Sequence, residues 1–438
     1  MSRYTCTACG VVTPKWSGKC DSCFEWNSIV EEIDSRSKKR KVNADIFSTL
    51  DTIESMNMKR LKTDMDEFDR VCGGGIVPGS VILIGGAPGI GKSTLMLQLA
   101  SQITNKGICA YATGEEGLSQ VKIRAERLKT NHDNFFMTTT TDILELTVAF
   151  ESLKGLGVAI IDSVQTMTHP DIDAPAGSVS QIRAVTQTLV DSAKRFGYAV
   201  LLIGHVTKEG GLAGPRVLEH MVDAVLYFDG DAQYDYRILR TNKNRFGPTN
   251  EIGIFRMTQS GLEEVKNPSS LFLNEGASVS GTSIAAGIEG TRVILCEVQA
   301  LATTSYLPSP RRVDVGWDHN RLATLVAVIQ SRCKIPLNDK DIYLNFAGGV
   351  SFKEPALDLA VAAALMSAVY DKPNNNKTAF IGEVSLSGSI RPVLHLDERI
   401  KEAKKLGFTN IYCNCSQEVI PEGVTKVTHL RDVKELYA

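Results

Sequence analysis

The 438-residue chain lacks the long apolar runs of a membrane or secreted protein. No stretch approaches the ~20 apolar residues that span a bilayer, and the first ten residues, MSRYTCTACG, contain no apolar core of a signal peptide. An excess of one charge is also missing, because 48 basic residues stand against 50 acidic ones. A basic field over the whole protein is thereby excluded, so any nucleic-acid site must be local. We therefore expect a cytoplasmic protein without a membrane partner.

A disulfide framework is not expected in that compartment, so the ten cysteines need another explanation. Four of them form two pairs, Cys6 with Cys9 and Cys20 with Cys23, each with two residues between the thiols. Two such pairs complete the tetrahedral thiolate set that Zn²⁺ prefers, and bound zinc would stabilise a segment too short to hold a hydrophobic core. A redox dithiol is the alternative. The spacing favours a zinc finger over residues 1–30, followed by a charged linker over residues 31–55.

A glycine-rich phosphate-binding loop is the strongest motif in the chain. An apolar run typical of a buried strand, residues 81–84, precedes it, and a helix-like run, residues 94–100, follows it. The loop and the start of the helix comprise Gly86, Ala87, Pro88, Gly89, Ile90, Gly91, Lys92, Ser93 and Thr94. The glycines allow backbone N–H groups to face an anion. Lys92 would contact the β and γ phosphates of ATP and Ser93 would bind Mg²⁺, whereas a turn without a ligand is the alternative.

Strand-like and helix-like segments alternate over residues 56–265, which predicts an α/β domain with a parallel sheet covered on both faces. Ligands of such sheets bind at the carboxyl ends of the strands. Glu115, Asp162 and His205 each follow a strand-like run. Glu115 would polarise the attacking water, Asp162 would hold the magnesium shell through water, and His205 would contact the γ-phosphate. A helix cap at Asp162 and a loop hydrogen bond at His205 are the alternatives.

Scattered cations mark two candidate DNA contacts. The glycine-rich segment that follows His205 carries Lys208 and Arg216, cannot pack a core and is expected to be mobile. Further along the chain, residues 305–312 contain one aromatic residue together with Arg311 and Arg312. A solvated loop without DNA is an equal alternative for this second segment.

The string Lys243-Asn244-Arg245-Phe246-Gly247 follows another strand-like run. With this string, the chain as a whole resembles the bacterial RadA (Sms) DNA-repair ATPases, which have a RecA-like core. The resemblance implies a homo-oligomer, a hexameric ring like that of replicative helicases, in which Lys243 and Arg245 complete the nucleotide site of the neighbouring subunit. It also implies that the chain processes recombination intermediates, with single-stranded or branched DNA and the RecA recombinase as partners. From the residues alone, the string would be an ordinary exposed turn.

Residues 276–438 resemble the proteolytic domain of the Lon family, an α+β fold of the ribosomal protein S5 domain 2 type. Residues 348–350 and the hairpin at residues 382–388 carry the resemblance. Aligned on them, the nucleophilic serine of the family falls at Ala356 and its lysine at Asp397, and neither residue can perform that chemistry. We therefore expect a catalytically degenerate scaffold that assembles rings or binds DNA. A Lon-type ATP-dependent protease and a RecA-like filament recombinase are the alternatives for the whole chain.

Overall fold

The computed structural model describes residues 3–6, 11–26, 28–32, 59–130, 133–205, 217–230, 235–274, 276, 279–349, 352, 354–415 and 420–437. The chain divides into two compact units, Met1–Asn57 and Met58–Ala438. The first unit contains an antiparallel three-stranded sheet in the order β2-β1-β3. Its strands are β1 (Arg3–Cys6), β2 (Val12–Thr13) and β3 (Ile29–Glu32).

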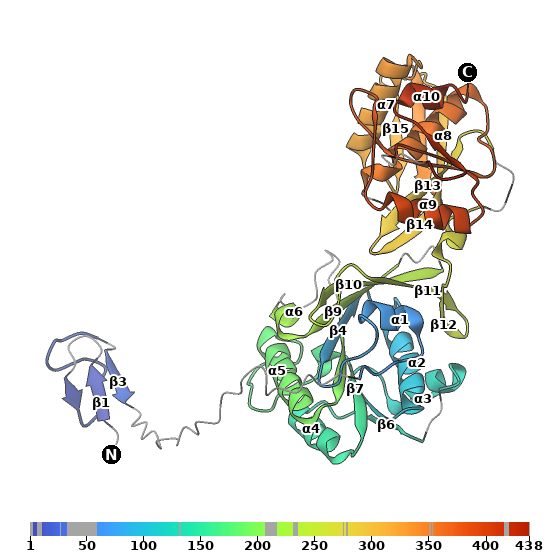
Figure 1. Ribbon diagram of the computed structural model, residues 1–438. Helices are drawn as coiled ribbons and strands as arrows, with labels where there is room; N and C mark the ends of the chain where they lie inside the picture. The colour runs from blue at the N-terminus through green and yellow to red at the C-terminus, as the bar shows by residue number, and fades with distance from the viewer. Residues whose placement is uncertain are drawn as a thin grey trace, which may run out of the picture. The chain divides into compact units, whose positions relative to one another are not determined.

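A nine-stranded sheet lies at the centre of the first part of the second unit (Figure 1). The strand order is β12-β11-β10-β9-β4-β8-β7-β5-β6, and neighbouring strands from β9 to β6 are all parallel. The parallel strands are β9 (Ala224–Asp229), β4 (Val81–Gly86), β8 (Ala199–His205), β7 (Leu156–Asp162), β5 (Ile108–Thr113) and β6 (Phe135–Thr138). The prediction of a parallel sheet is confirmed for this part of the chain.

Helices cover both faces of this sheet (Figure 1). Along β4, Ile82 and Ile84 belong to a core shared with α2 and α3, whereas Val81 and Leu83 belong to a core shared with α4, α5 and α6. Such strands are buried on both faces and therefore carry an uninterrupted apolar run. The helices are α1 (Asp66–Val71), α2 (Lys92–Thr104), α3 (Leu118–Arg127), α4 (Ile143–Ser152), α5 (Val179–Phe196) and α6 (Val217–Met221).

Three antiparallel strands extend the sheet beyond β9. The first matches the strand-like run before Lys243, whereas the alternation of strands and helices did not predict the antiparallel pairing. The three strands are β10 (Tyr236–Asn244), β11 (Ile252–Thr258) and β12 (Gly261–Glu264). Each pairs with the preceding strand through a short connection, as antiparallel strands can. Strand β10 extends to Asn244, so Lys243 and Asn244 belong to it and not to an exposed turn.

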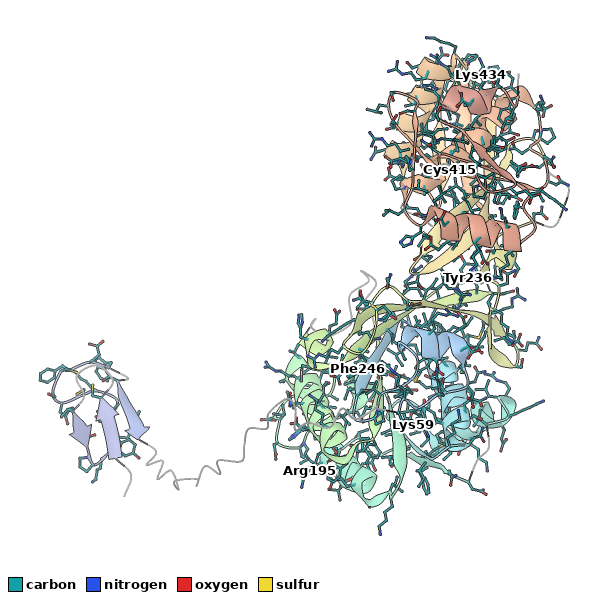
Figure 2. All side chains as sticks on the ribbon, in the orientation of Figure 1. Lys59, Arg195, Tyr236, Phe246, Cys415 and Lys434 are labelled. Carbon is teal, nitrogen blue, oxygen red and sulfur yellow. The ribbon has the colours of Figure 1, made fainter. Side chains whose placement is uncertain are left out.

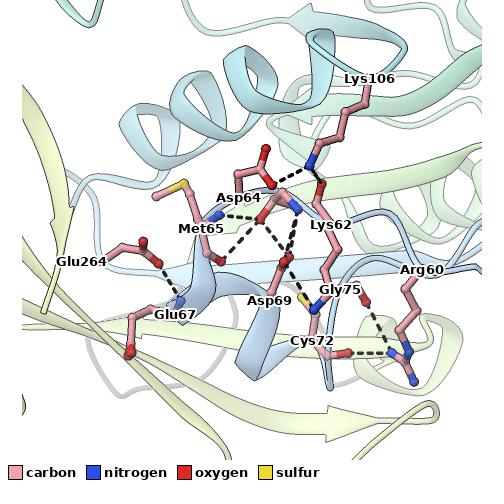
Figure 3. Close-up of polar contacts among 11 residues, drawn as sticks. Arg60, Lys62, Asp64, Met65, Glu67, Asp69, Cys72, Gly75, Lys106 and Glu264 are labelled. Atoms are coloured by element: carbon pink, nitrogen blue, oxygen red, sulfur yellow. Dashed lines mark hydrogen bonds and ion pairs between the residues drawn. The ribbon is translucent and has the colours of Figure 1, made fainter. Parts of the chain in front are cut away.

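Polar contacts within residues 60–75 fix the segment around α1, and the backbone N–H of Glu67 donates to Oε1 of Glu264 in β12 at 2.6 Å (Figure 3). The buried Asp69 carboxylate accepts hydrogen bonds from the backbone N–H of Thr63 at 3.1 Å and from its hydroxyl at 2.9 Å. The Arg60 guanidinium donates to the carbonyl oxygens of Cys72 at 3.1 Å and Gly75 at 3.3 Å. Burial raises the pKa of Asp69, against the effect of the hydrogen bonds from Thr63. This segment is thereby anchored before the chain enters β4.

A second, seven-stranded sheet follows in the order β15-β16-β14-β13-β17-β20-β21. It contains parallel and antiparallel pairs and has an α+β organisation, as expected. Its strands are β13 (Thr282–Glu289), β14 (Arg292–Thr304), β15 (Arg312–Val315), β16 (Lys340–Phe346), β17 (Thr378–Ile381), β20 (Asn410–Cys413) and β21 (Val424–Lys426). With it are α7 (His319–Cys333), α8 (Asp358–Tyr370), α9 (Leu396–Lys405), α10 (Leu430–Lys434) and the hairpin of β18 (Glu383–Val384) and β19 (Ile390–Arg391).

Side chains from the nine-stranded sheet take part in the core of this last region. Ile238 and Ile254 lie in the same buried cluster as residues of α7 and α8. The hydroxyl of Tyr236, labelled in Figure 2, donates to the carbonyl oxygen of Gly348 at 2.6 Å. These contacts agree with the assignment of Met58–Ala438 to one compact unit. None of the helices in the described ranges is long and apolar enough to cross a membrane.

Candidate functional site

The phosphate-binding loop leaves β4 at Gly86 and enters α2 at Lys92. Gly89 and Gly91 have φ angles of +76° and +115°, in the left-handed region that favours glycine. A methyl group on Gly86 would lie 2.6 Å from the carbonyl oxygen of Phe228, so the strand end tolerates no side chain there. Residues 87–89 are exposed at the crest of the loop. The loop therefore combines the backbone freedom and the open crest that a phosphate site needs.

Lys92, the first residue of α2, directs its ammonium group back into the loop. Its Nζ donates to the carbonyl oxygens of Gly86 at 2.8 Å and Ala87 at 3.0 Å. Burial lowers the pKa of Lys92, while the carboxylates of Asp162 and Glu115 act in the opposite direction. A cation is thus held beside the loop with two acidic groups in its electrostatic range. Ser93 and Thr94 follow in the same turn of the helix and are half-buried.

Asp162 ends β7, and the residue is buried, with 5% of its surface exposed. Its Oδ2 accepts a hydrogen bond from the Tyr111 hydroxyl at 2.6 Å. Its Oδ1 is buried and has no hydrogen-bond partner among the residues that the structure describes. Burial raises the pKa of Asp162, while hydrogen bonding by Tyr111 and by the nearby Ser93 hydroxyl lowers it. A carboxylate oxygen left open beside a hydroxyl is the donor chemistry that suits Mg²⁺ and its water shell.

Glu115 follows β5, the strand next to β7 in the sheet. Thr113 is in register with Asp162, and the backbone N–H of Gly114 donates to the Asp162 carbonyl oxygen at 2.9 Å. The Ser163 hydroxyl donates to Oε1 of Glu115 at 2.5 Å. The Glu115 side chain is exposed, so water can reach it. The fold thus brings the two acids together from positions 47 residues apart (162 minus 115).

His205 ends β8, where it is in register with Gly86 at the end of the adjacent β4. The backbone therefore places it at the same sheet edge as the phosphate-binding loop. Its side chain is outside the described part of the structure, as are Lys208 and Arg216.

Lys243 lies within β10, and all three donors of its ammonium group are used at the C-terminal end of α6. Nζ donates to the carbonyl oxygens of Glu219 at 2.7 Å, His220 at 3.3 Å and Val222 at 2.8 Å. Cations stabilise helix C-termini in this way. Burial and the charge of Arg245 lower the pKa of Lys243. In this conformation Lys243 caps α6, a role that the sequence did not indicate.

Arg245 forms an ion pair with Asp223, with 3.0 Å between Nη1 and Oδ1. Oδ2 of Asp223 accepts the backbone N–H of Val81 at 3.0 Å, which links Arg245 to the first residue of β4. The Arg245 side chain is half exposed. The next residue, Phe246 (Figure 2), receives a hydrogen bond on its carbonyl oxygen from Arg60 at 2.6 Å. The string is therefore anchored at its backbone, with a guanidinium accessible at the surface.

Three cysteines of the expected zinc finger converge in the first unit. The sulfur atoms of Cys6, Cys20 and Cys23 lie within 4.8 Å of one another, and those of Cys6 and Cys23 are 3.6 Å apart. Cys9 lies outside the described residues. Thiols that converge from two such pairs fit the ligand set of a structural Zn²⁺ site.

The two arginines expected to contact DNA in the last region differ in their surroundings. Arg311 is exposed. The guanidinium of Arg312 donates to the carbonyl oxygens of Arg311, Lys340 and Leu337, the last at 3.0 Å. Burial lowers the pKa of Arg312. Arg312 thus ties β15 to the turn before β16, which leaves Arg311 as the more accessible cation.

A partly buried ion pair joins the two chain segments that carry the expected Lon-type serine and lysine positions. Ala356 is buried and Asp397 is exposed in the first turn of α9. Arg399, which is 2% exposed, donates to both carboxylate oxygens of Glu354 at 3.0 and 2.6 Å. The prediction missed this pair because a single arginine on an amphipathic helix forms no motif. The pair supplies no nucleophile at this position.

Three family models match parts of this chain. A model of the AAA domain covers residues 49–211, which include the phosphate-binding loop, Glu115 and Asp162. A model of the rubredoxin metal binding domain covers residues 4–31, which include the four cysteines. A model of subunit ChlI of Mg-chelatase covers residues 318–416 of the last region. The first two support an ATPase domain and a zinc ribbon.

Relatives match the chain over nearly its whole length. The DNA repair protein RadA of Streptococcus pyogenes serotype M6 is 46% identical and covers 97% of this chain and 96% of its own. That of Rickettsia felis is 48% identical and covers 99% of this chain and 98% of its own. Among solved structures, that of the RadB recombinase aligns with 47% of this chain and 100% of its own, at 21% identity and a TM-score of 0.38. The relatives show that the chain belongs to the RadA family of DNA repair proteins.

Proposed function

We propose that this protein is a DNA-stimulated ATPase that works as a hexameric ring on single-stranded or branched DNA and promotes branch migration during RecA-mediated strand exchange. One observation carries the proposal: Lys92, Asp162 and Glu115 converge beside the phosphate-binding loop at one edge of the sheet. The relatives named DNA repair protein RadA supply the biological setting.

Each residue of this site has a defined task in the proposed reaction. Magnesium, when bound, would neutralise charge on the phosphates, with Ser93 and the open oxygen of Asp162 as its protein partners. Lys92 would exchange the two loop carbonyls for phosphate oxygens. Glu115 would orient the attacking water. His205, at the end of β8 and next to β4 in the sheet, would contact the γ-phosphate.

The ring follows from the proposed task of Lys243 and Arg245, which would complete the nucleotide site of a neighbouring subunit. Arg245 is half exposed, and among the described residues its side chain has the ion pair with Asp223 alone to exchange. Lys243 would have to leave three carbonyl oxygens at the end of α6. We therefore propose that Arg245 makes the main contact with the transferring phosphoryl group and that Lys243 supports it.

The test of the nucleotide site is Lys92→Ala, which should abolish ATP hydrolysis while the far-ultraviolet circular dichroism stays that of the parent. Hydrolysis at the parental rate would refute the site.

The test of the shared site mixes two inactive variants, Lys92→Ala and Arg245→Ala. A mixed ring contains interfaces with an intact Lys92 on one side and an intact Arg245 on the other, so activity should return on mixing. If the variants form mixed oligomers and remain inactive, the shared site is wrong.

The test of DNA as a partner is the ATPase rate with and without single-stranded DNA across a salt series. Contacts with backbone phosphates release counterions, so the stimulation should decline as salt rises. A rate that single-stranded and branched DNA leave unchanged at low salt would contradict the proposal.

A further inference from the structure

Tyr111 is a buried tyrosine at the nucleotide site to which the proposed reaction assigns no task. It lies in β5 and is 1% exposed. Its ring packs edge-on against Phe135, with 6.1 Å between the ring centroids and 86° between the planes. Its hydroxyl donates to Oδ2 of Asp162 at 2.6 Å. The ring and the hydroxyl are thus both held in place.

Asp162 needs such a contact because its carboxylate is buried and can rotate about its last side-chain bond. With Oδ2 held by Tyr111, Oδ1 is the oxygen that remains open, and it has no hydrogen-bond partner among the described residues. A hydrogen bond from a phenol to an ionised carboxylate is charge-assisted and short, as here. It therefore selects one orientation of the carboxylate.

We infer that Tyr111 is a positioning residue of the magnesium site, which acts by holding the Asp162 carboxylate with one oxygen toward the metal shell. The inference rests on the proposed ATPase site but not on the ring or on DNA. Residues that orient metal-binding groups in this way typically change metal affinity by about 10- to 100-fold when they are replaced.

The chain offers a matched control in Tyr198. This tyrosine is also buried, at 2% exposure, and its hydroxyl donates to the Ser192 hydroxyl at 2.7 Å. It lies just before β8, and its hydrogen bond joins no residue of the nucleotide site. Tyr198→Phe therefore removes an equivalent buried hydroxyl without touching Asp162.

The experiment measures equilibrium binding of ATP by calorimetry, once with excess Mg²⁺ and once in EDTA. Tyr111→Phe should weaken binding in Mg²⁺ by about 10-fold or more and leave binding in EDTA within about twofold. Tyr198→Phe should leave both affinities unchanged. In an Asp162→Ala background, Tyr111→Phe should have no further effect, since the carboxylate that it positions is gone.

The outcomes separate this inference from the proposed function. Equal weakening of ATP binding in Mg²⁺ and in EDTA would mean that Tyr111 shapes the fold and not the metal site. Parental affinity of Tyr111→Phe under both conditions would also overturn the inference. If the parent protein itself binds ATP equally with and without Mg²⁺, the magnesium assignment within the proposed function fails instead. Thermal denaturation of both phenylalanine variants confirms that each is folded.

Discussion

At the scale of single residues, burial determines which groups can ionise in the folded protein. Cys413 ends β20 and is fully buried, and burial raises the pKa of its thiol from 9.0 to about 12. In the unfolded chain this thiol ionises near its ordinary pKa. Its contribution to stability is therefore complete below about pH 9 and is lost as the pH rises from there toward about 12.

Cys413→Ala should accordingly make the protein less sensitive to alkali. Above about pH 9, the free energy of unfolding of the parent should fall more steeply than that of the variant, by up to ~1.4 kcal/mol per pH unit. Urea denaturation at a series of pH values measures both slopes. Ile411→Val, in the same strand, removes a buried methylene but no ionisable group and should retain the parental slope. Equal slopes for the parent and Cys413→Ala would contradict the prediction.

At the scale of elements, sequence patterns predicted the parallel strands well and the string at residues 243–247 poorly. The parallel strands carry continuous apolar runs because both of their faces are buried, and such runs are visible in one dimension. The string is polar, and its place depends on α6 and, through Asp223, on the first residue of β4. Its residues alone therefore suggested an exposed turn, whereas the structure makes its first two residues the end of β10.

The capping of α6 by Lys243 leads to a prediction about that helix. Lys243→Ala should speed amide hydrogen exchange in residues 217–222, because three carbonyl oxygens lose their cationic donor. The local free energy of opening should fall by about 1–2 kcal/mol. Lys122→Ala, at an exposed position of α3, is the matched control and should leave exchange in α6 unchanged. Unaltered exchange in the Lys243 variant would show that the lysine does not stabilise the helix.

At the scale of the whole molecule, the chain consists of two units that we expect to respond separately to metal removal. A chelator should unfold the unit Met1–Asn57, because its buried core is small and centres on cysteines. The melting temperature of Met58–Ala438 should stay unchanged. Cys20→Ser should reproduce the effect of the chelator.

Tryptophan fluorescence can follow this unit alone. The chain has three tryptophans, of which Trp16 and Trp26 lie in the first unit and Trp317 is buried in the second. In a Trp317→Phe variant the remaining signal reports only on the zinc ribbon, where Trp16 donates to the carbonyl oxygen of Ile29 at 3.1 Å. A chelator that leaves this signal unchanged, or an elemental analysis without zinc, would refute the assignment.

The last region should not cleave peptides, even when the missing serine is restored. Ala356→Ser places a hydroxyl near the Glu354–Arg399 ion pair but supplies no neutral amine to activate it, since Asp397 stands at the lysine position. Casein degradation by the parent and by this variant should both equal the background. Peptide release by the parent in the presence of ATP would favour the protease alternative.

By itself, the sequence determined the phosphate-binding loop, the cysteine pairs and the parallel strands. Each of these is a local property: a motif makes its own backbone geometry, and a buried strand carries its own apolar run. Only the tertiary structure decided which distant side chains meet. Tyr111 meets Asp162 across 51 residues, Lys243 meets the end of α6 across 24, and Arg399 meets Glu354 across 45. No periodicity links such positions, because their contact depends on how strands and helices pack against one another.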